Sequence, residues 1–308
     1  MGLTILDGPM GTALGEAGVA MGAPQWSAHA LETSPETVSA VHRRHAAAGA
    51  HVLTANTFRT TARAWGSGWA DRARQAVMLA RAAAPQGVRV AGSIAPLEDC
   101  YRPELSPIDP GREHAETAAV LHEAGCDLLL CVTFPHEKEA LAAVRAAVGT
   151  GRPTWLALTA GPGADLLTPR AVGRIARKAV DEGASAVLVN CIPASQTLAY
   201  VQAIAGCGVP FGAYANAGSP REGMGWGPAP EGDARYLGFA RTWVDVGATL
   251  IGSCCGTTPS VTSTLARHFG RDGDRACAAD GRVQAGAMDD GTDDRAVTEG
   301  PSGSMSKP

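Results

Sequence analysis

The stretch Leu250-Ile251-Gly252-Ser253-Cys254-Cys255-Gly256-Thr257-Thr258-Pro259 begins as a short apolar run and leads into two adjacent cysteines. Neighbouring side chains of a regular strand point to opposite faces of the sheet. The two sulfurs can therefore face one point only where the chain leaves strand geometry, and Gly252 and Gly256 permit this. The stretch predicts a buried strand that opens into an irregular turn.

The same unit, an apolar run that opens into polar residues and is followed by a helical pattern, recurs along the chain. The expected strands are residues 3–7, 51–55, 88–92, 127–132, 153–159, 185–189, 209–214 and 248–251. The expected helices are residues 35–48, 68–84, 109–124, 136–148, 168–182, 195–205, 231–246 and 260–268. This alternation predicts an α/β protein that forms a single (β/α)8 TIM barrel. A doubly wound sheet is the alternative, but Gly8-Pro9-Met10-Gly11 does not match its G-x-G-x-x-G fingerprint.

The alternation stops near residue 270. Residues 271–308 contain many Asp and Gly residues, no aromatic residue and no hydrophobic period. Such a segment cannot bury enough apolar surface to offset the entropy of ordering. We therefore predict a barrel domain over residues 1–269 and a disordered tail over residues 270–308.

Composition narrows the classes of partner. A net charge of −4 over 308 residues lacks the excess of positive charge that is typical of nucleic-acid-binding domains. No apolar stretch reaches the roughly 18 residues that a membrane span needs, and the N-terminus lacks the basic and apolar regions of a signal peptide. We therefore expect a cytoplasmic protein with no nucleic-acid and no membrane partner. The sequence does not indicate an oligomeric state.

Polar or sulfur-bearing side chains follow the ends of most of the expected strands, where barrel enzymes carry their chemistry. They are Asp7, Asn56, Ser93, Thr133, Asn190, Cys191, Asn216, Cys254 and Cys255. Polar residues often begin loops, which would explain each Asn, Ser or Thr singly. Three cysteines after the sixth and eighth strands are poorly explained in that way. We predict that Cys191, Cys254 and Cys255 hold one Zn²⁺ ion.

The remaining cysteines and the histidines offer no better ligand set. Eight cysteines in a cytoplasmic chain of this length favour free thiols or metal over a disulfide framework. His42 and His45 fit an exposed helix face, so we expect no histidine ligand. A redox pair of Cys254 and Cys255 is the alternative, but it would be strained, and C-x-x-C spacing is absent. We interpret the other five cysteines as small buried side chains: Cys100, Cys126, Cys131, Cys207 and Cys277.

A catalytic zinc site keeps one position open for a substrate. Three thiolates on Zn²⁺ leave a net charge of −1, and a thiol that enters the open position is deprotonated below its usual pKa of about 8.5. The bound sulfur then keeps enough electron density to act as a nucleophile. A site rich in nitrogen or oxygen ligands would favour hydrolysis instead. The predicted site therefore indicates group transfer onto a thiol.

Six motifs together resemble the homocysteine S-methyltransferase family, and their order agrees from Met1 to about His268. They are Asp7-Gly8-Pro9-Met10-Gly11-Thr12, Ala55-Asn56-Thr57-Phe58, Gly92-Ser93-Ile94-Ala95-Pro96, Val189-Asn190-Cys191, Asn216-Ala217-Gly218 and Gly252-Ser253-Cys254-Cys255-Gly256-Thr257. The resemblance implies a zinc-dependent (β/α)8 barrel that methylates homocysteine to methionine. It also implies that Cys191, Cys254 and Cys255 are the zinc ligands. We expect substrate contacts from the other residues of these motifs, namely Asp7, Asn56, Phe58, Ser93, Asn190 and Asn216, and from Thr133.

The resemblance implies that Asp7 lies near the amino group of the thiol acceptor. The chain is too short for the cobalamin and folate modules of larger relatives, which favours a small methyl donor such as S-methylmethionine, S-adenosylmethionine or betaine. Each of these carries an onium charge that an aromatic ring could bind through its face. The candidate rings are Trp26, Phe58, Tyr101, Tyr214 and Trp226.

Two positions depart from the family pattern. Val132-Thr133 stands where the family usually has Glu-Thr, and that Glu helps to hold the substrate amine. Gly252-Ser253 replaces the usual Gly-Gly before the two cysteines. We therefore expect a zinc-dependent S-methyltransferase with homocysteine as the favoured acceptor. The alternatives are another small thiol or selenol as acceptor, or a zinc-bearing barrel that binds or regulates without turnover.

Overall fold

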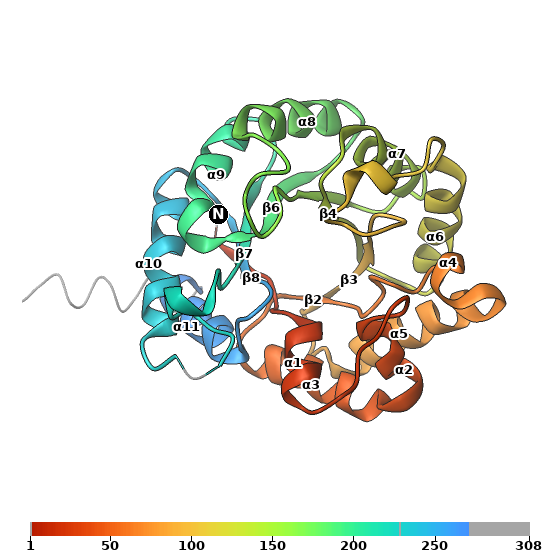
Figure 1. Cartoon of the computed structure of the whole chain (residues 1–308), viewed down its shortest axis with the longest axis horizontal. Coiled ribbons are helices and arrows are strands. Elements are labelled where there is room, and N and C mark those ends of the chain that lie inside the picture. Colours follow the sequence, from red (N-terminus) through yellow and green to blue (C-terminus); the bar gives the residue numbers. More distant parts are fainter. Residues whose placement is uncertain (1, 228, 271–308) are drawn as a thin grey trace, which may run out of the picture. The chain divides into compact units, whose positions relative to one another are not determined.

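The computed structural model describes residues 2–227 and 229–270, in which strands alternate with helices around a ring (Figure 1). The strands are β1 (Thr4–Ile5), β2 (Val52–Thr54), β3 (Arg89–Ile94), β4 (Leu128–Phe134), β5 (Thr154–Leu158), β6 (Ala186–Pro193), β7 (Phe211–Asn216) and β8 (Leu250–Ser253). The main helices are α3 (Pro35–Ala47), α5 (Trp69–Ala83), α6 (Gly111–Glu123), α7 (Glu137–Val148), α8 (Pro169–Asp181), α9 (Leu198–Ile204), α10 (Gly232–Asp245) and α11 (Pro259–Phe269). Each predicted strand and helix is confirmed, with boundaries that shift by a few residues.

Three short helices were not predicted. The loop after β1 contains α1 (Met10–Glu16) and α2 (Ala30–Thr33), and the loop after β2 contains α4 (Ala62–Trp65). All three lie on the side of the ring where the red and orange segments gather in Figure 1. Helices this short form through tertiary packing, so their sequences carry a weak periodic signal.

The strands form one parallel sheet in which neighbours in sequence are neighbours in space. Hydrogen-bonded pairs run in order from β2 to β8, and β8 pairs with β1. An isolated parallel bridge between Leu6 and Val52 joins β1 to β2. The His51 N–H also donates to the Ile5 carbonyl at 2.7 Å across this gap. This order confirms the (β/α)8 barrel, because a doubly wound sheet reverses its strand order at a switch point.

Two apolar layers hold the barrel. The interior is filled by a cluster of buried side chains: Leu6, Val52, Ala91, Leu128, Leu130, Val132, Trp155, Ala157, Ala186, Leu188, Tyr214 and Leu250. A second layer joins the strands to the helices, as on α8, where Val172, Ile175 and Ala179 recur at helical spacing and are buried. Because side chains fill the interior, the barrel is not a channel. A reaction site in such a barrel lies at one end of the strands.

Two strands continue past their predicted ends through an irregularity. The register of β4 shifts between Cys131 and Phe134, and that of β6 shifts between Asn190 and Pro193. Inside these bulges Thr133 has a φ of 65° and Cys191 a φ of 50°. Non-glycine residues rarely adopt positive φ, and such strain collects where a side chain must be re-aimed. Both residues belong to the predicted site.

The expectation that His42 and His45 lie on an exposed helix face is wrong. Each is only 1% exposed, because this face of α3 packs inward and not toward solvent. Burial lowers the pKa of His42 to about 3 and that of His45 to about 4, so both rings are neutral. The predicted disordered tail lies, apart from Gly270, outside the described residues. Within the described ranges, no helix is long and apolar enough to cross a membrane.

Candidate metal and substrate site

Three cysteine sulfurs meet at the carboxyl end of the barrel. The Sγ atom of Cys191 lies 2.7 Å from that of Cys254 and 4.0 Å from that of Cys255, and the last two are 3.9 Å apart. Cys191 is buried, whereas Cys254 and Cys255 are half-buried. The structure therefore brings together the three predicted ligands, from β6 and from the turn after β8.

The turn after β8 explains how adjacent cysteines face one point. The Cys254 N–H donates to the Ala215 carbonyl at 2.8 Å, and the Thr257 hydroxyl donates to the Cys254 carbonyl at 2.8 Å. Gly256 has a φ of 81°, which confirms the predicted departure from strand geometry. The prediction was wrong for Gly252, which stays in β8. A Cβ atom there would lie 2.8 Å from that of Leu6, so Gly252 is needed for close packing.

Asn216 holds the backbone of Cys191. Its Nδ2 donates to the Cys191 carbonyl at 3.1 Å, and its Oδ1 accepts from the Gly218 N–H at 2.8 Å. The amide thus ties the bulge in β6 to the loop after β7. Both polar ends of the amide are used in these bonds, so Asn216 orients Cys191.

Replacing Asn216 with alanine is expected to weaken metal binding by about 10- to 100-fold, the usual effect of losing a group that orients a ligand. The freed Cys191 carbonyl no longer fixes the direction of its side chain. Competition with a zinc chelator measures the change. Equal affinities in Asn216→Ala and wild-type protein would contradict this role.

The sulfur cluster is electrostatically uneven. Contacts with Cys254 and Cys255, together with burial, raise the pKa of Cys191 well above its usual range. Hydrogen bonds from Cys191 and Cys254 lower the pKa of Cys255. A soft divalent cation bound by the three sulfurs would favour loss of their protons.

The donor set of the cluster suits a metal ion. Three sulfur atoms within 4.8 Å of one another match the thiolate-rich sites that hold zinc and other soft cations. In the part of the chain that the structure describes, no histidine or carboxylate completes this group. The cluster fits a metal centre that keeps a position open for another ligand.

Asp7 is a buried carboxyl just after β1. Its Oδ2 accepts from the Thr54 N–H at 2.7 Å, and its Oδ1 accepts from the Thr54 hydroxyl at 2.9 Å. Burial raises the pKa of Asp7 from 3.8 to about 7, although the bonds from Thr54 oppose this shift. A cation placed beside Asp7 would favour its ionised form. The sequence did not single out Thr54, whose position in β2 gave no sign of this pairing.

This shift predicts a pH-dependent stability. The folded chain keeps the Asp7 proton up to a pH of about 7, whereas the unfolded chain releases it near 3.8. The free energy of unfolding therefore falls as the pH rises through this window. Between pH 5 and pH 8 the fall due to Asp7 is roughly 2–3 kcal/mol.

Urea unfolding of metal-free wild-type and Asp7→Asn proteins at both pH values isolates this contribution. The difference in free energy of unfolding between the two proteins should change by that amount between pH 5 and pH 8. Asp7→Asn should be the relatively more stable protein at pH 8. A difference that does not vary with pH would show that Asp7 ionises normally.

Asn190 and Thr133 pair across the two bulges. Asn190 Nδ2 donates to the Thr133 hydroxyl at 2.7 Å. Asn190 Oδ1 and Tyr214 Oη, both buried, have no hydrogen-bond partner among the described residues. Buried polar atoms are rarely left unpaired, so these two are available to a bound molecule.

Two other predicted contact residues use their polar groups within the fold. Asn56 Oδ1 accepts from the Ser27 hydroxyl, and Asn56 Nδ2 donates to the Ser27 carbonyl, both at 2.9 Å. The Ser93 hydroxyl lies 2.8 Å from that of Thr57. These bonds fix the segments that carry Trp26 and Phe58. Direct substrate contact by Asn56 or Ser93 stays a prediction.

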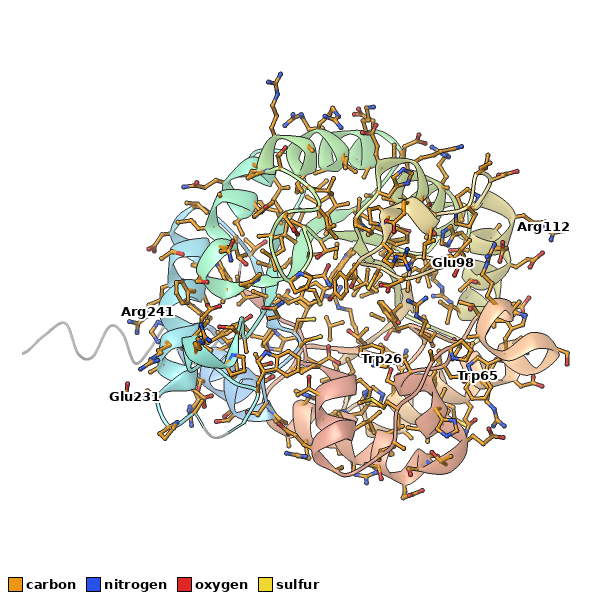
Figure 2. The ribbon with its side chains drawn as sticks, viewed as in Figure 1. Trp26, Trp65, Glu98, Arg112, Glu231 and Arg241 are labelled. Carbon is orange, nitrogen blue, oxygen red and sulfur yellow. The ribbon has the colours of Figure 1, made fainter. Side chains whose placement is uncertain are left out.

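An aromatic pair borders the barrel mouth. The rings of Trp26 and Phe58 meet edge to face with centroids 5.9 Å apart. Phe58 and Cys254 both pack against the interior cluster, and Trp26 is 40% exposed. Figure 2 shows Trp26 toward the middle of the ring, whereas Glu231 and Arg241 lie at its outer rim. The pair offers aromatic surface at the end of the barrel that holds the sulfurs.

Trp226 packs against the turn that follows the two cysteines. Its indole N–H donates to the Gly218 carbonyl at 2.7 Å, and its backbone N–H donates to the Gly256 carbonyl at 2.9 Å. A Cβ atom at Gly256 would lie 2.5 Å from the indole ring. Trp226 therefore covers the residue that follows Cys255.

Comparison with known proteins identifies relatives over nearly the whole described chain. The family model for homocysteine S-methyltransferase matches residues 4–269. Homocysteine S-methyltransferase of Escherichia coli is 31% identical over 85% of this chain and 94% of its own length. Selenocysteine Se-methyltransferase of Brassica oleracea is 25% identical over 87% of this chain and 89% of its own.

A solved structure has the same fold. The metallated form of the homocysteine methyltransferase MmuM from Escherichia coli aligns with a TM-score of 0.71 and 25% identity. The alignment covers 86% of this chain and 96% of that one. With the sulfur cluster and the barrel topology, these matches lead to one conclusion: the chain belongs to the homocysteine S-methyltransferase family of methyltransferase enzymes.

Proposed function

We propose that the protein transfers a methyl group from a small onium donor to the sulfur of homocysteine, with Cys191, Cys254 and Cys255 holding Zn²⁺. The observation that carries this proposal is the cluster of three sulfurs at the carboxyl end of the barrel, with Sγ separations of 2.7–4.0 Å. Its two half-buried members leave access from solvent for a further ligand. The Escherichia coli relative has been solved in a metallated form, which supports a metal in the family.

Zinc held by three thiolates would supply an open position that favours the deprotonated form of an entering thiol. The chain's own residues fix the surroundings of that position. Asn216 orients Cys191, and the turn from Cys254 to Thr257 orients the other two sulfurs. Burial of Cys191 lowers the local dielectric constant, which strengthens electrostatic interactions on that side of the site.

Asp7 supports an acceptor that carries an amino group. An ammonium beside the buried carboxyl would restore its ionised form and gain a charge-assisted hydrogen bond. Asn190 Oδ1 and Tyr214 Oη, which lack partners in the described chain, are available to accept further N–H groups. Homocysteine has the thiol and the amine that such a site would bind.

The aromatic pair supports an onium donor. Trp26 and Phe58 present ring surface at the end of the barrel that holds the sulfurs, and a sulfonium or quaternary ammonium binds to such surfaces by cation–π attraction. In the transfer, a lone pair of the acceptor sulfur forms the new bond to the methyl carbon. The bond from that carbon to the onium atom breaks, and its electron pair stays on the neutral donor product. The transfer itself moves no proton.

A different small thiol or a selenol is the second candidate acceptor. Val132 is buried in the apolar cluster against which Cys254 also packs, and its position carries no carboxylate to bind an amine. An acceptor whose amine needs only one carboxylate, that of Asp7, would fit such a site. The Brassica oleracea relative named for selenocysteine supports a selenol as such an acceptor.

A panel of acceptors and donors tests the proposal. Zinc-loaded protein is incubated with homocysteine, selenocysteine or cysteine, together with S-methylmethionine, S-adenosylmethionine or betaine. Methionine formation with one of these donors is the expected result. Turnover of another acceptor without turnover of homocysteine would support the second candidate. The absence of turnover with every pair, in protein that binds zinc, would favour a binding or regulatory role.

A further inference from the structure

The loop between β3 and α6 is tied at both ends to one buried carboxylate. Glu139, in the first turn of α7, is 1% exposed. Its Oε1 accepts from the Leu97 N–H at 2.8 Å, and its Oε2 accepts from the Ser106 hydroxyl at 2.5 Å. The gold segment after β3 in Figure 1 accordingly folds toward α7. A single side chain thus fixes the start and the end of a ten-residue segment.

His114 completes this buried clamp. Its Nε2 lies 3.2 Å from Glu139 Oε1, and the residue is fully buried. Hydrogen bonds from His114, Leu97 and Ser106 outweigh the effect of burial and lower the pKa of Glu139. The carboxylate is therefore ionised, and the bonds that it accepts from the loop are charge-assisted. Such bonds are stronger than neutral ones, so the loop is held firmly.

The clamped loop carries Tyr101 toward the sulfur cluster. A Cβ atom at Gly161, after β5, would lie 3.8 Å from Tyr101 Cδ1, so the ring reaches past β4. Gly161 follows β5, so the Tyr101 ring lies at the carboxyl end of the strands, which is also the end that holds the cysteine sulfurs. Negative charge on the cysteines, Cys191 first, and burial both raise the pKa of Tyr101.

The start of the loop also touches the aromatic pair. Arg59 Nη1 donates to the Pro96 carbonyl at 3.2 Å, and its guanidinium carbon lies 5.3 Å from the centroid of the Phe58 ring. The guanidinium occupies one face of Phe58. Tyr101 and the Trp26–Phe58 pair therefore border the same end of the barrel.

We propose that Tyr101 is a substrate-contacting residue whose ring borders the methyl-donor position, and that Glu139 is the positioning residue that holds it there. This proposal rests on the proposed methyl transfer. An aromatic ring at the end of the barrel that holds the sulfurs suits a compact onium cation, which the face of the ring attracts. Glu139 acts only through the loop, because its oxygens are used by Leu97, Ser106 and His114.

Four variants test this arrangement. Tyr101→Leu removes the ring, Ser106→Ala removes one tether, and Glu139→Met removes both. Tyr101→Phe keeps the ring. Glu98→Gln is the matched control, because Glu98 lies on the same loop but pairs with Arg63 at the surface.

We expect Ser106→Ala to raise the KM for the onium donor by about tenfold, the effect of losing one charged hydrogen bond. Tyr101→Leu should raise the donor KM at least as much. Tyr101→Phe, which keeps the ring, should have a donor KM close to that of the wild type.

A second measurement does not depend on turnover. Metal-free protein is treated with a disulfide reagent, and the rates of modification of Cys254 and Cys255 are followed by mass spectrometry. A loosened loop exposes these thiols, so Ser106→Ala and Glu139→Met should react several times faster than Glu98→Gln and wild type. This result would hold even if the proposed methyl transfer failed.

Two outcomes would overturn the proposal. If thiol reactivity and the donor KM are both unchanged in folded Ser106→Ala protein, the clamp is excluded. Ser106→Ala gives this answer even if Glu139→Met fails to fold, because Ser106→Ala keeps the buried carboxylate. A normal donor KM in Tyr101→Leu would exclude the ring from the donor position. Lack of turnover in wild-type protein, with faster thiol modification in Ser106→Ala, would reject the proposed function and leave the clamp intact.

Discussion

Cys191→Ser is expected to lose bound zinc and to lower kcat/KM for methyl transfer by about a thousandfold, because activation of a nucleophile by a metal contributes several kcal/mol. Cys191 is the only one of the three sulfur residues that comes from β6, and its Sγ lies 2.7 Å from that of Cys254. The serine hydroxyl of this variant leaves only two thiolate ligands, whereas the proposed zinc site uses three. Metal content after gel filtration and initial rates on the same sample measure both effects.

Cys207→Ser is the matched control. Cys207 is likewise a free thiol, although half-buried where Cys191 is buried, and its Sγ contacts the Val209 carbonyl and not the cluster. This variant should keep full metal content and rate. Retained zinc and activity in Cys191→Ser would contradict the three-sulfur site.

Asp7→Asn is expected to raise the KM for homocysteine by about a hundredfold, since an unpaired buried charge costs 2–5 kcal/mol. The physical reason is the loss of an ionised partner for the ammonium of the acceptor. The same variant should change little with 4-mercaptobutanoate, which is homocysteine without its amino group. Comparing the two acceptors in both proteins isolates the contact between Asp7 and the amine.

Asp127→Asn controls for damage to the barrel. Asp127 also accepts a backbone N–H, that of Val90 at 2.7 Å, but it precedes β4 and so lies at the other end of the strands. Its substitution should leave the homocysteine KM unchanged. An equal loss for both acceptors in Asp7→Asn would assign Asp7 to folding through Thr54, and not to the amine.

Local sequence patterns predicted the fold because barrel units are built from local signals. Thr168 and Pro169 begin α8 as expected, and the Thr168 hydroxyl accepts from the Ala171 N–H at 3.2 Å. The polar residues after the strands gather at one end because all the strands are parallel. The three cysteines could be grouped for this reason before their distances were known.

The finer features of the site depend on contacts between residues distant in sequence. The positive φ of Cys191 follows from a bulge that Asn216 stabilises, 25 residues later. The burial of His45 depends on α11, where Thr262 lies 3.1 Å from its Nδ1. A helical pattern that contains Arg43 and Arg44 gives no sign of this packing. The roles of Asn56 and Ser93 likewise depended on Ser27 and Thr57, which no local rule pairs with them.

The zinc K-edge absorption spectrum of the protein, isolated under reducing conditions, tests the central claim most directly. We expect one zinc per chain with three sulfur ligands at about 2.3 Å, and a fourth sulfur after homocysteine is added. A shell dominated by nitrogen or oxygen, or protein that binds no zinc, would contradict the account.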